Sequence, residues 1–358
     1  MKKCDIIIPV WNQLEVTREC VNSIEKHTDP AHRLIIIDNG SDEDTSEYLK
    51  GLKGKIAAET ILIRNDKNLG FVKAVNEGIA VSDSPYLCVM NNDTIATAGW
   101  LEEMIKVMEA NPQIGILNPS SNTSGQYPGE KSIDDYALGL KEFTGQIQEL
   151  YACRGFCFLM RREVVEKVGL FDEIFDMGYF EETDYCTRAQ KALFLVARAK
   201  GAYVYHKESA TFKQLGKEKE VLFNKNEMIF FKKWGRPLKV GYFIEGAYSK
   251  EKIDDIASSV ARNGHQITIF FKRGTQWPVE LDHSEIRRSE VNALFFAPEV
   301  IYKILKRKKK KKIEVLLTDN GPFGKLLDSL KFLHGSDVMV SPDKNRLLEY
   351  LKVKSWQI

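Results

Sequence analysis

The chain has 358 residues, a formal net charge of +2 and 43% hydrophobic residues, which is enough apolar content for two folded domains. The near-balanced charge excludes a general electrostatic attraction to nucleic acid, and the modest number of Pro and Gly residues excludes a fibrous or largely disordered chain. The six cysteines include no CxxC pair and several lie in apolar runs, which favours reduced, buried thiols over a disulfide framework or a zinc site.

The N-terminus turns acidic at Asp5, which is too early for a signal peptide. No apolar run approaches the roughly 18 residues that a bilayer-spanning helix needs. We therefore expect a cytoplasmic protein.

Short β-rich apolar runs alternate with amphipathic patterns, which predicts an α/β fold with a mostly parallel sheet flanked by helices. In chain order we expect strands at residues 5–10, 34–38, 61–64 and 86–90, with helices at 14–24, 43–52, 71–81 and 100–109. Residues 118–129 are rich in Ser, Asn, Gly and Pro, which predicts a loop. Regular structure then resumes at 152–161, followed by a helix at 184–191, a strand that ends at His206 and a helix at 218–234.

The tripeptide Gly235-Arg236-Pro237 predicts a boundary between a first domain, residues 1–235, and a second, residues 237–358. Beyond it we expect strands at 239–244, 266–271, 292–297, 313–318 and 337–341 and a helix at 253–263, the pattern of a small Rossmann-like module. Neither a GxGxxG fingerprint nor a Walker loop is present in the sequence.

Polar side chains follow each strand predicted for the first domain. In open α/β sheets ligands bind beyond the carboxyl ends of the strands, so these residues are candidates for a site. The set comprises Pro9, Trp11, Asn12, Asp38, Asn39, Asp42, Arg64, Asn65, Asn68, Asn91, Asn92, Asp93 and His206. Taken singly, each of these clusters also fits ordinary turn chemistry.

Five segments follow the order of a known family: residues 5–12, residues 35–42, Asn68-Leu69-Gly70-Phe71 with Asn76, residues 90–94, and residues 155–162 followed by 178–184. Together they resemble the family 2 inverting glycosyltransferases, which have the GT-A fold, and the resemblance covers about residues 4–230. The Asn-Leu-Gly-Phe and Asn-Asn-Asp-Thr variants are most similar to the bacterial branch of rhamnosyl- and galactofuranosyltransferases. The resemblance implies a metal-dependent enzyme of the hexosyltransferase class that uses a nucleoside-diphosphate sugar and inverts the anomeric centre.

For the donor, the resemblance implies one group of contacts. Asp38 would accept hydrogen bonds from the base or ribose, and Pro9 and Asn12 would form the floor beneath the nucleoside. Arg64 and Asn68 would place the nucleotide, with Asn92 beside it. Gly70 would let the backbone approach the ligand closely.

For the metal, the resemblance places Asn91-Asn92-Asp93 at the DxD position of the family. Asp93 would bind a divalent cation, Mn²⁺ or Mg²⁺, that bridges the donor phosphates, since both ions prefer oxygen ligands. His206 would be a further ligand; a lone histidine at a strand end can also be structural. Asn91 departs from the family pattern, and the missing negative charge predicts low metal affinity without the donor.

The acidic cluster at 181–184 is expected to hold the catalytic base. Inverting transfer needs one carboxylate that takes the proton from the attacking hydroxyl, and adjacent acids raise each other's pKa toward neutrality. The resemblance implies Glu182 as that base and Asp184 as the second choice. The alternative is that the acids cap the helix that follows, which we consider most fitting for Asp184.

Residues 237–358 resemble the first half of a two-lobed GT-B glycosyltransferase, through 239–244 and 261–268. Its role stays open between acceptor binding, docking and a truncated second enzyme. The seven consecutive basic residues 306–312 suit an anionic membrane surface or a lipid diphosphate, and equally a solvated helix end.

Two other functions stay open at this point. A sugar nucleotidyltransferase would place a Gly-rich loop after the first strand, where this chain has Pro9-Val10-Trp11-Asn12-Gln13. A catalytically inactive glycan- or nucleotide-sugar-binding protein is the other alternative, which Asn91 favours. For an active enzyme we expect a glycan or lipid-linked acceptor, in bacterial surface polysaccharide or glycoconjugate synthesis at the inner face of the membrane, with peripheral membrane contact.

Overall fold

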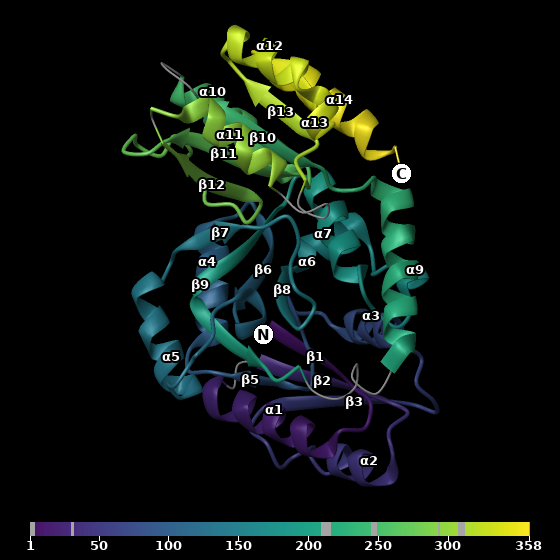
Figure 1. The fold of residues 1–358 in the computed structure, drawn as a ribbon. Coiled ribbons are helices and arrows are strands. Elements are labelled where there is room, and N and C mark those ends of the chain that lie inside the picture. The colour runs from purple at the N-terminus through teal and green to yellow at the C-terminus, as the bar shows by residue number, and fades with distance from the viewer. Residues whose placement is uncertain are drawn as a thin grey trace. The chain divides into compact units, whose positions relative to one another are not determined.

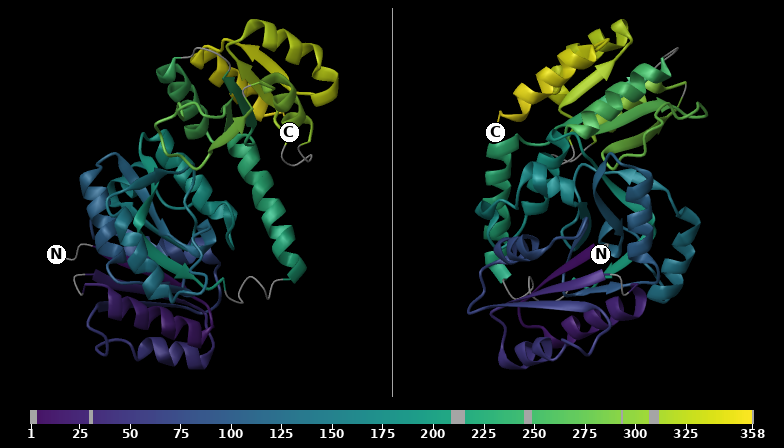
Figure 2. Two further views of the ribbon diagram at one scale, coloured as in Figure 1. Left: turned by 60° about the vertical axis from the view of Figure 1, so that its left-hand side comes forward. Right: turned by 180° about the vertical axis from the view of Figure 1, so that it is seen from behind.

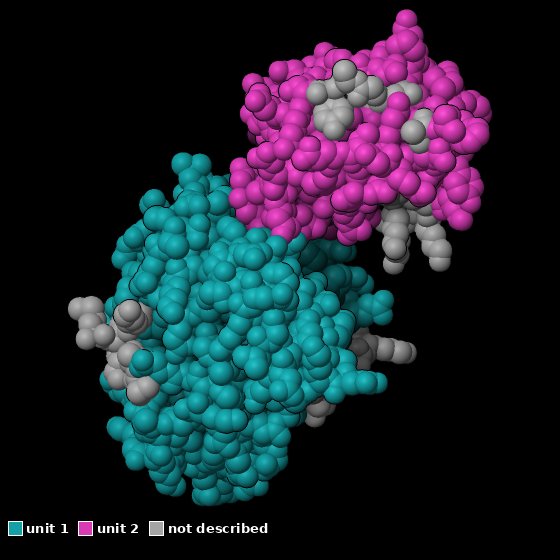
Figure 3. Space-filling model, turned by 90° about the vertical axis from the view of Figure 1, so that its left-hand side faces the viewer, with its two compact units in different colours: residues 1–148, 152–228 teal, residues 149–151, 229–358 magenta. Residues whose placement is uncertain are grey.

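The structure is a computed structural model that describes residues 4–29, 32–208, 216–244, 249–292, 294–306 and 312–357. The chain divides into two compact units (Figure 3). Residues 1–148 and 152–228 form the first unit, drawn in teal, and residues 149–151 and 229–358 form the second, drawn in magenta. The domain limits expected from the sequence, 1–235 and 237–358, stay a prediction.

A nine-stranded sheet forms the centre of the first unit, with helices on both of its faces (Figure 1, Figure 2). Its strands run in the order β3-β2-β1-β4-β8-β6-β9-β5, and β7 pairs with β9 off this path. The first four are parallel, while β8 runs antiparallel to both β4 and β6 and β5 runs antiparallel to β9. The strands are β1 (Cys4–Val10), β2 (His32–Asn39), β3 (Glu59–Asn65), β4 (Tyr86–Met90), β5 (Thr94–Ala96), β6 (Ile114–Ser120), β7 (Ile147–Glu149), β8 (Cys157–Arg161) and β9 (Leu195–His206).

Eight α-helices are described along this part of the chain: α1 (Leu14–His27), α2 (Glu43–Lys50), α3 (Phe71–Val81), α4 (Trp100–Ala110), α5 (Ile133–Leu140), α6 (Arg162–Val168), α7 (Glu181–Lys191) and α9 (Gly216–Trp234). The 3-10 turns are η1 (Asn122–Ser124), η2 (Lys141–Phe143) and η3 (Glu173–Phe175). Strand β6 includes residues 118–120, so the loop expected at 118–129 begins three residues later than predicted.

The isoleucine runs of β1 and β2 explain why the sheet is covered on both faces. Ile6 and Ile8 belong to the core beneath α1, α2 and α4, whereas Ile7 points to the opposite face, under α3. All three are fully buried, and an unbroken run of β-branched residues is typical of parallel strands buried on both faces. Gly78 of α3 lies so close to β1 that a Cβ there would overlap the Cγ2 of Ile7.

The second unit is a five-stranded sheet in the order β12-β11-β10-β13-β14, and all of its strands are parallel. From β10 the chain first adds β11 and β12 on one side and then β13 and β14 on the other, so the strand order reverses between β10 and β13. Its strands are β10 (Lys239–Ile244), β11 (Gln266–Lys272), β12 (Ile286–Val291), β13 (Val315–Thr318) and β14 (Asp337–Val340). Its helices are α10 (Lys250–Arg262), α11 (Phe296–Leu305), α12 (Gly321–Ser329), α13 (Lys331–His334) and α14 (Lys344–Ser355). The predicted α/β class, with a helix-flanked sheet followed by a smaller parallel unit, is confirmed; the likeness to half of a GT-B enzyme stays a prediction.

The strand expected at residues 292–297 is wrong. β12 lies earlier, at Ile286–Val291, and α11 begins at Phe296. β12 is an edge strand with exposed Arg287 and Arg288, so it lacks the apolar run that announces a central strand. The apolar residues after it instead repeat at helical spacing, with Phe296, Val300 and Ile304 buried.

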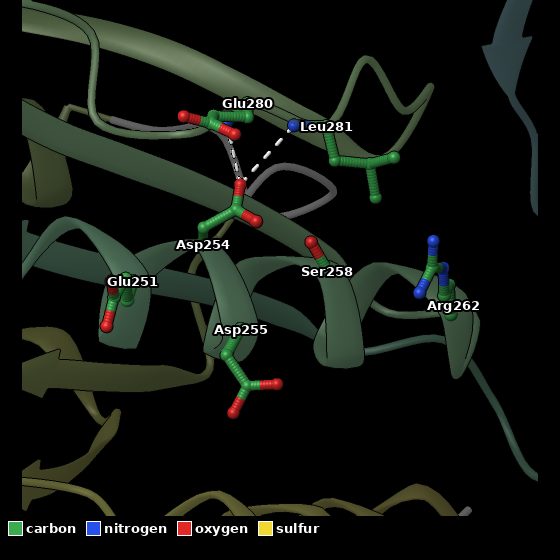
Figure 4. Close-up of a pocket in the computed structure, with 7 residues that line it drawn as sticks. All are labelled: Glu251, Asp254, Asp255, Ser258, Arg262, Glu280 and Leu281. Atoms are coloured by element: carbon green, nitrogen blue, oxygen red, sulfur yellow. Dashed lines mark hydrogen bonds between the residues drawn. The ribbon is translucent and has the colours of Figure 1, made fainter.

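A surface hollow beside α10 is lined by Glu251, Asp254, Asp255, Ser258, Arg262, Glu280 and Leu281 (Figure 4). Asp254 accepts hydrogen bonds from the backbone N–H groups of Glu280, at 2.6 Å, and Leu281, at 3.3 Å. Arg262 makes a two-pronged ion pair with Glu149 at 2.8 Å. These contacts fasten neighbouring segments of the second unit to α10. None of the described helices combines the length and apolar character needed to cross a membrane.

Candidate functional site

The carboxyl ends of β3, β2, β1 and β4 lie side by side, because these strands are neighbours and parallel. The polar residues that the sequence places after each strand therefore meet at one edge of the sheet, as predicted. They form one polar cluster at the ends of β1–β3 and a second cluster after β4.

Asp38 is the centre of the first cluster. Its carboxylate is fully buried, accepts a hydrogen bond from the Ser41 N–H at 2.9 Å, and forms an ion pair with Arg64. Arg64 also donates to the Ser41 carbonyl at 3.0 Å and keeps 40% of its side chain exposed. A buried carboxylate that loses its cation is strongly destabilised, so a ligand that displaces Arg64 from Asp38 has to donate hydrogen bonds to the carboxylate in its place.

Asn12 braces the same loop from the end of β1. Its backbone is left-handed, with φ of 56°, and its N–H donates to the Ser41 hydroxyl at 2.9 Å. Its side-chain oxygen accepts from the Asp42 N–H at 2.8 Å. Pro9 lies on β1 opposite Ile37 of β2 and is partly exposed. The structure thus brings Asn12, Asp38 and Arg64 together around Ser41.

Asn68 and Gly70 make their contacts with other residues of the protein, at Asn39 and Asp176. The Asn68 side-chain oxygen accepts from the Asn39 amide and from the Gly70 N–H, both at 2.9 Å. Gly70 has φ of 89°, and a Cβ there would lie 3.1 Å from the carbonyl oxygen of Asp176. The close approach that this glycine permits is therefore to the backbone at Asp176. Asn39, which the sequence also places at this strand end, accepts a hydrogen bond from the Leu69 N–H at 3.0 Å and so connects the turn to β2.

Asp93 and His206 are the pair expected to bind a metal. The Asp93 Oδ1 and His206 Nε2 atoms lie 3.1 Å apart, because β5 pairs with the end of β9 and sets Thr94 opposite His206. Asn122 brackets the histidine, accepting from its N–H and donating to its carbonyl, each at 2.8 Å. The Nδ1 atom of His206 is buried and has no hydrogen-bond partner.

The donor set fits a divalent cation only in part. Asp93 and His206 supply one oxygen and one nitrogen, and the described residues contain no group of three His, Cys, Asp or Glu placed to hold a metal. Mg²⁺ is commonly held by one or two carboxylates together with substrate phosphates, which suits Asp93, whereas the His206 imidazole is a softer ligand than Mg²⁺ prefers. Asn92, expected at the donor, instead donates to the Thr17 hydroxyl of α1 at 2.8 Å.

Glu181 and Glu182 open helix α7 and are the second acidic group of the site. Burial raises the pKa of Glu181 well above its usual value, and the charge of Glu182 raises it further. Burial also raises the pKa of Glu182, against the opposing effects of hydrogen bonds and of the Arg154 cation. One carboxylate oxygen of each side chain is buried without a hydrogen-bond partner. Such an arrangement can accept a proton near neutral pH.

Asp184 has a different setting. It is fully buried and accepts a hydrogen bond from the Arg188 Nε at 2.9 Å, one helical turn away. Arg188 in turn donates to the Val168 and Leu170 carbonyls. Phe180 stands at the N-cap of α7, so the cap role considered for Asp184 is wrong. Its carboxylate joins α7 to the loop after α6.

Residues 155 and 156 connect the two acidic groups. The Phe156 carbonyl accepts from the Asn91 N–H at 2.8 Å, and its ring stacks on His206 with centroids 5.3 Å apart. Next to it, a Cβ at Gly155 would lie 3.4 Å from the Glu181 Oε1 atom. The Asp93–His206 pair and the glutamate pair therefore flank one short segment of chain.

The loop that leads into α7 has an unusual backbone. Asp176, Gly178, Tyr179 and Phe180 all have positive φ, between 49° and 116°. Strained backbone of this kind persists only where surrounding contacts enforce it.

Asn226 of α9 supplies those contacts and was missed by the sequence reading. It is fully buried, and its amide donates to the carbonyls of Phe175 at 2.9 Å, Gly178 at 2.7 Å and Tyr179 at 3.3 Å. The ring of Phe223, one turn earlier, lies 5.6 Å from Tyr179 and 5.2 Å from Phe180. One face of α9 thus holds the loop that positions Glu181 and Glu182.

Residues 5–169 match the family model described as Glycosyl transferase family 2. Glycosyltransferase AglE of Haloferax volcanii is 28% identical over 170 residues, which are 46% of this chain and 55% of the relative. Poly-beta-1,6-N-acetyl-D-glucosamine synthase of Staphylococcus epidermidis is 23% identical over 171 residues, 46% of this chain and 41% of the relative. The chain thus spans about half the length of these curated relatives.

Among solved structures, the mannosyltransferase PcManGT from Pyrobaculum calidifontis in complex with GDP-Man and Mn²⁺ is similar at a TM-score of 0.49 and 12% identity, over 64% of each chain. The family match, together with the observed sheet, confirms the GT-A type of fold predicted from the sequence motifs.

Proposed function

Because residues 5–169 belong to glycosyl transferase family 2, we propose that the first unit transfers a sugar from a nucleoside-diphosphate donor to an acceptor hydroxyl. The observation that carries the proposal is the Glu181–Glu182 pair, in which each side chain has one buried oxygen without a hydrogen-bond partner, beside the segment that also contacts His206. Buried polar atoms without partners are costly, so a polar ligand that satisfies them is expected.

In this proposal the acceptor hydroxyl meets Glu182. The new bond from the acceptor oxygen to the anomeric carbon forms as the bond from that carbon to the diphosphate oxygen breaks, which inverts the centre. Glu182 takes the proton of the attacking hydroxyl, and its raised pKa makes it a fitting base near neutral pH. Glu181 lies beside it. Asp184, engaged with Arg188, is the weaker candidate for the base.

The donor would lie over the ends of β1–β3. Asp38 would bind the base or ribose, with Arg64 turning from Asp38 toward the nucleotide. Asn12 and Pro9 would shape the floor, and Asn68, Gly70 and Asn92 would support it by holding the surrounding turns. A UDP- or dTDP-linked hexose is the donor we propose.

Asp93 and His206 would hold a divalent cation, Mn²⁺ or Mg²⁺, and such an ion neutralises negative charge on a leaving diphosphate. The 3.1 Å between their facing atoms suits two ligands of one ion. Asn91, with a buried side-chain oxygen that lacks a partner, adds no charge, so we expect tight metal binding only together with the donor.

For the acceptor we propose a glycan or a lipid-linked saccharide, in bacterial surface polysaccharide or glycoconjugate synthesis. Within the family, we propose that the chain belongs to the branch of rhamnosyl- and galactofuranosyltransferases. A cytoplasmic location at the inner face of the membrane, with peripheral contact, goes with this proposal.

The test is a donor panel: nucleotide sugars with Mn²⁺ or Mg²⁺, scored for release of the nucleoside diphosphate, on the full chain. Glu182→Gln and Asp93→Ala should each abolish turnover of the one donor accepted. Glu173→Gln is the matched control, since Glu173 precedes the same loop but is exposed. Formation of a nucleotide sugar from a sugar phosphate would favour a nucleotidyltransferase, and donor or glycan binding without turnover would favour an inactive binding protein; either result overturns the proposal.

A further inference from the structure

Arg154 is an exposed arginine next to the base of the proposed reaction. It precedes Gly155, where a Cβ would lie 3.8 Å from the carboxyl carbon of Glu182. Burial raises the pKa of Glu182, and the positive charge of Arg154 opposes that rise, so the two groups are close enough to interact. A cation at the protein surface therefore adjoins the glutamate that would take the proton of the acceptor.

The guanidinium group of Arg154 is available to a ligand. Among the residues that the structure describes, none makes a hydrogen bond or an ion pair with it. The other arginines of the first unit have partners: Arg18, Arg33, Arg64 and Arg188 pair with carboxylates, Arg161 and Arg162 donate to backbone carbonyls, and Arg198 is also engaged. Arg154 thus differs from them in facing solvent without a protein partner.

The backbone of Arg154 is fixed although its side chain is exposed. Asn118 of β6, which is 1% exposed, accepts from the Arg154 N–H at 2.6 Å and donates to the Arg154 carbonyl at 3.1 Å. The preceding N–H, of Cys153, donates to the Cys186 sulfur of α7 at 3.3 Å. An arginine that is only solvated needs no such anchoring. A fixed backbone leaves less conformational entropy to be lost when the side chain binds a ligand.

The place of Arg154 indicates which substrate it meets. In an inverting displacement the attacking hydroxyl and the leaving diphosphate lie on opposite sides of the anomeric carbon. Glu182 serves the attacking hydroxyl, so the charge beside Glu182 lies on the side of the acceptor. A guanidinium group binds phosphate and carboxylate through two parallel hydrogen bonds, which makes either anion a fitting ligand.

We propose that Arg154 binds an anionic group of the acceptor, a phosphate or a carboxylate close to the attacking hydroxyl. The inference rests on the proposed sugar transfer and narrows the acceptor to a saccharide or lipid-linked saccharide that carries negative charge. Glu181 and Glu182 would repel such an acceptor, and Arg154 offsets that repulsion. A neutral acceptor would leave the guanidinium group with water alone.

The test uses the full chain, the donor accepted in the panel and Mg²⁺, and it follows hydrolysis of the donor with water in place of the acceptor, at constant ionic strength. Methyl phosphate and acetate are the probes for the two kinds of anion. An anion held by Arg154 leaves the donor region free, so it should inhibit without competing with the donor. Arg154→Gln should raise the inhibition constant about tenfold, the lower end of what a hydrogen bond to a charged group contributes, and leave the donor KM within about twofold. Stronger inhibition by methyl phosphate than by acetate assigns a phosphate-bearing acceptor, and the reverse assigns an acidic sugar.

A second measurement needs no turnover. Phenylglyoxal modifies accessible guanidinium groups, and mass spectrometry follows the rate of modification at Arg154. One of the two anions should slow that rate severalfold. If no donor is hydrolysed, the proposed function fails, while this measurement still decides whether Arg154 binds an anion.

Arg346 is the matched control, because it is an exposed arginine on α14 of the second unit. Arg346→Gln should leave the inhibition constant unchanged, and neither anion should protect Arg346 from phenylglyoxal. Three results overturn the proposal: inhibition that competes with the donor and is lost in Arg154→Gln, which would assign Arg154 to the donor diphosphate; an inhibition constant that is the same in Arg154→Gln as in the wild type; or modification of Arg154 that neither anion slows.

Discussion

Replacement of Asn226 by Ala tests whether α9 positions the loop that precedes Glu181 and Glu182, the glutamates of the proposed site. The side chain makes two full hydrogen bonds, to the Phe175 and Gly178 carbonyls, and a longer one to the Tyr179 carbonyl. Leaving two buried carbonyls unsatisfied costs roughly 1–3 kcal/mol each. If the loop kept its shape, the free energy of unfolding would fall by about 2–6 kcal/mol.

Without the Asn226 side chain, the loop can instead change conformation and release its backbone strain, which costs less free energy. Asp176, Tyr179 and Phe180 are non-glycine residues with left-handed backbone, each costing roughly 1–2 kcal/mol. That strain is comparable to what Asn226 contributes, so without the clamp the loop is expected to change conformation and move Glu182, two residues beyond Phe180. A shift of about 1 Å at a catalytic group can cost on the order of 100-fold in rate.

We therefore expect Asn226→Ala to lower kcat roughly 100-fold while the donor KM stays within about twofold, because the donor region over β1–β3 is untouched. The assay is steady-state release of nucleoside diphosphate with the accepted donor, together with a thermal melt. Asn226→Asp should behave alike, since a carboxylate cannot donate to carbonyls.

The control is Asn76→Ala. Asn76 is also buried and makes two hydrogen bonds to one loop residue, Phe171, at 2.9 and 3.0 Å. Asn76→Ala should lower the melting temperature about as much as Asn226→Ala does, while its kcat stays within a few fold of the wild-type value. Equal kcat losses in Asn226→Ala and Asn76→Ala, or an unchanged kcat in Asn226→Ala, would refute the positioning argument.

Three further predictions follow from the same geometry. Glu181→Gln should raise the melting temperature at pH 7–8 but not near pH 4. Because the pKa of Glu181 is raised in the folded state, that state keeps a proton which the unfolded chain has lost, and wild-type stability falls as the pH rises above the unfolded-state pKa near 4.5. A variant that is less stable than the wild type at every pH would contradict this. Gly70→Ala should lower the melting temperature by several degrees, from the left-handed backbone and the 3.1 Å contact with Asp176, and an unchanged melt would refute it; Gly129→Ala, also left-handed but in open space, should lower it less. A chelator should abolish turnover, and added Mn²⁺ should restore it in the wild type but not in Asp93→Ala; activity that survives the chelator would count against the proposed cation site.

The polar edge of the first sheet could be predicted from sequence because one rule covers it. Parallel strands place their carboxyl ends together, so the residues after four apolar runs had to converge, and Asp38 and Arg64 do. The Asp93–His206 pairing was anticipated only through the family resemblance. No periodicity connects two residues that are 113 positions apart.

What could not be predicted depends on tertiary contacts. Asn226 looks like any polar residue of an amphipathic helix, and its partners lie about 50 positions earlier in the chain. The role of Asp184 was readable in principle, because Arg188 stands four residues on, the spacing of a helical ion pair. Strand β12 escaped detection since edge strands need no apolar run.

The contact between Gly78 and Ile7 restricts how this sequence can vary over evolutionary time. A methyl group at position 78 would overlap the Ile7 side chain and drive α3 away from the sheet. The N-terminal end of α3 begins just after Gly70, and the Val72 N–H bonds to the Asp176 carbonyl at 3.2 Å. A shift of α3 caused by alanine at position 78 would therefore displace the loop that precedes Glu181 and Glu182. We expect homologues with alanine at position 78 to carry a residue smaller than isoleucine at position 7.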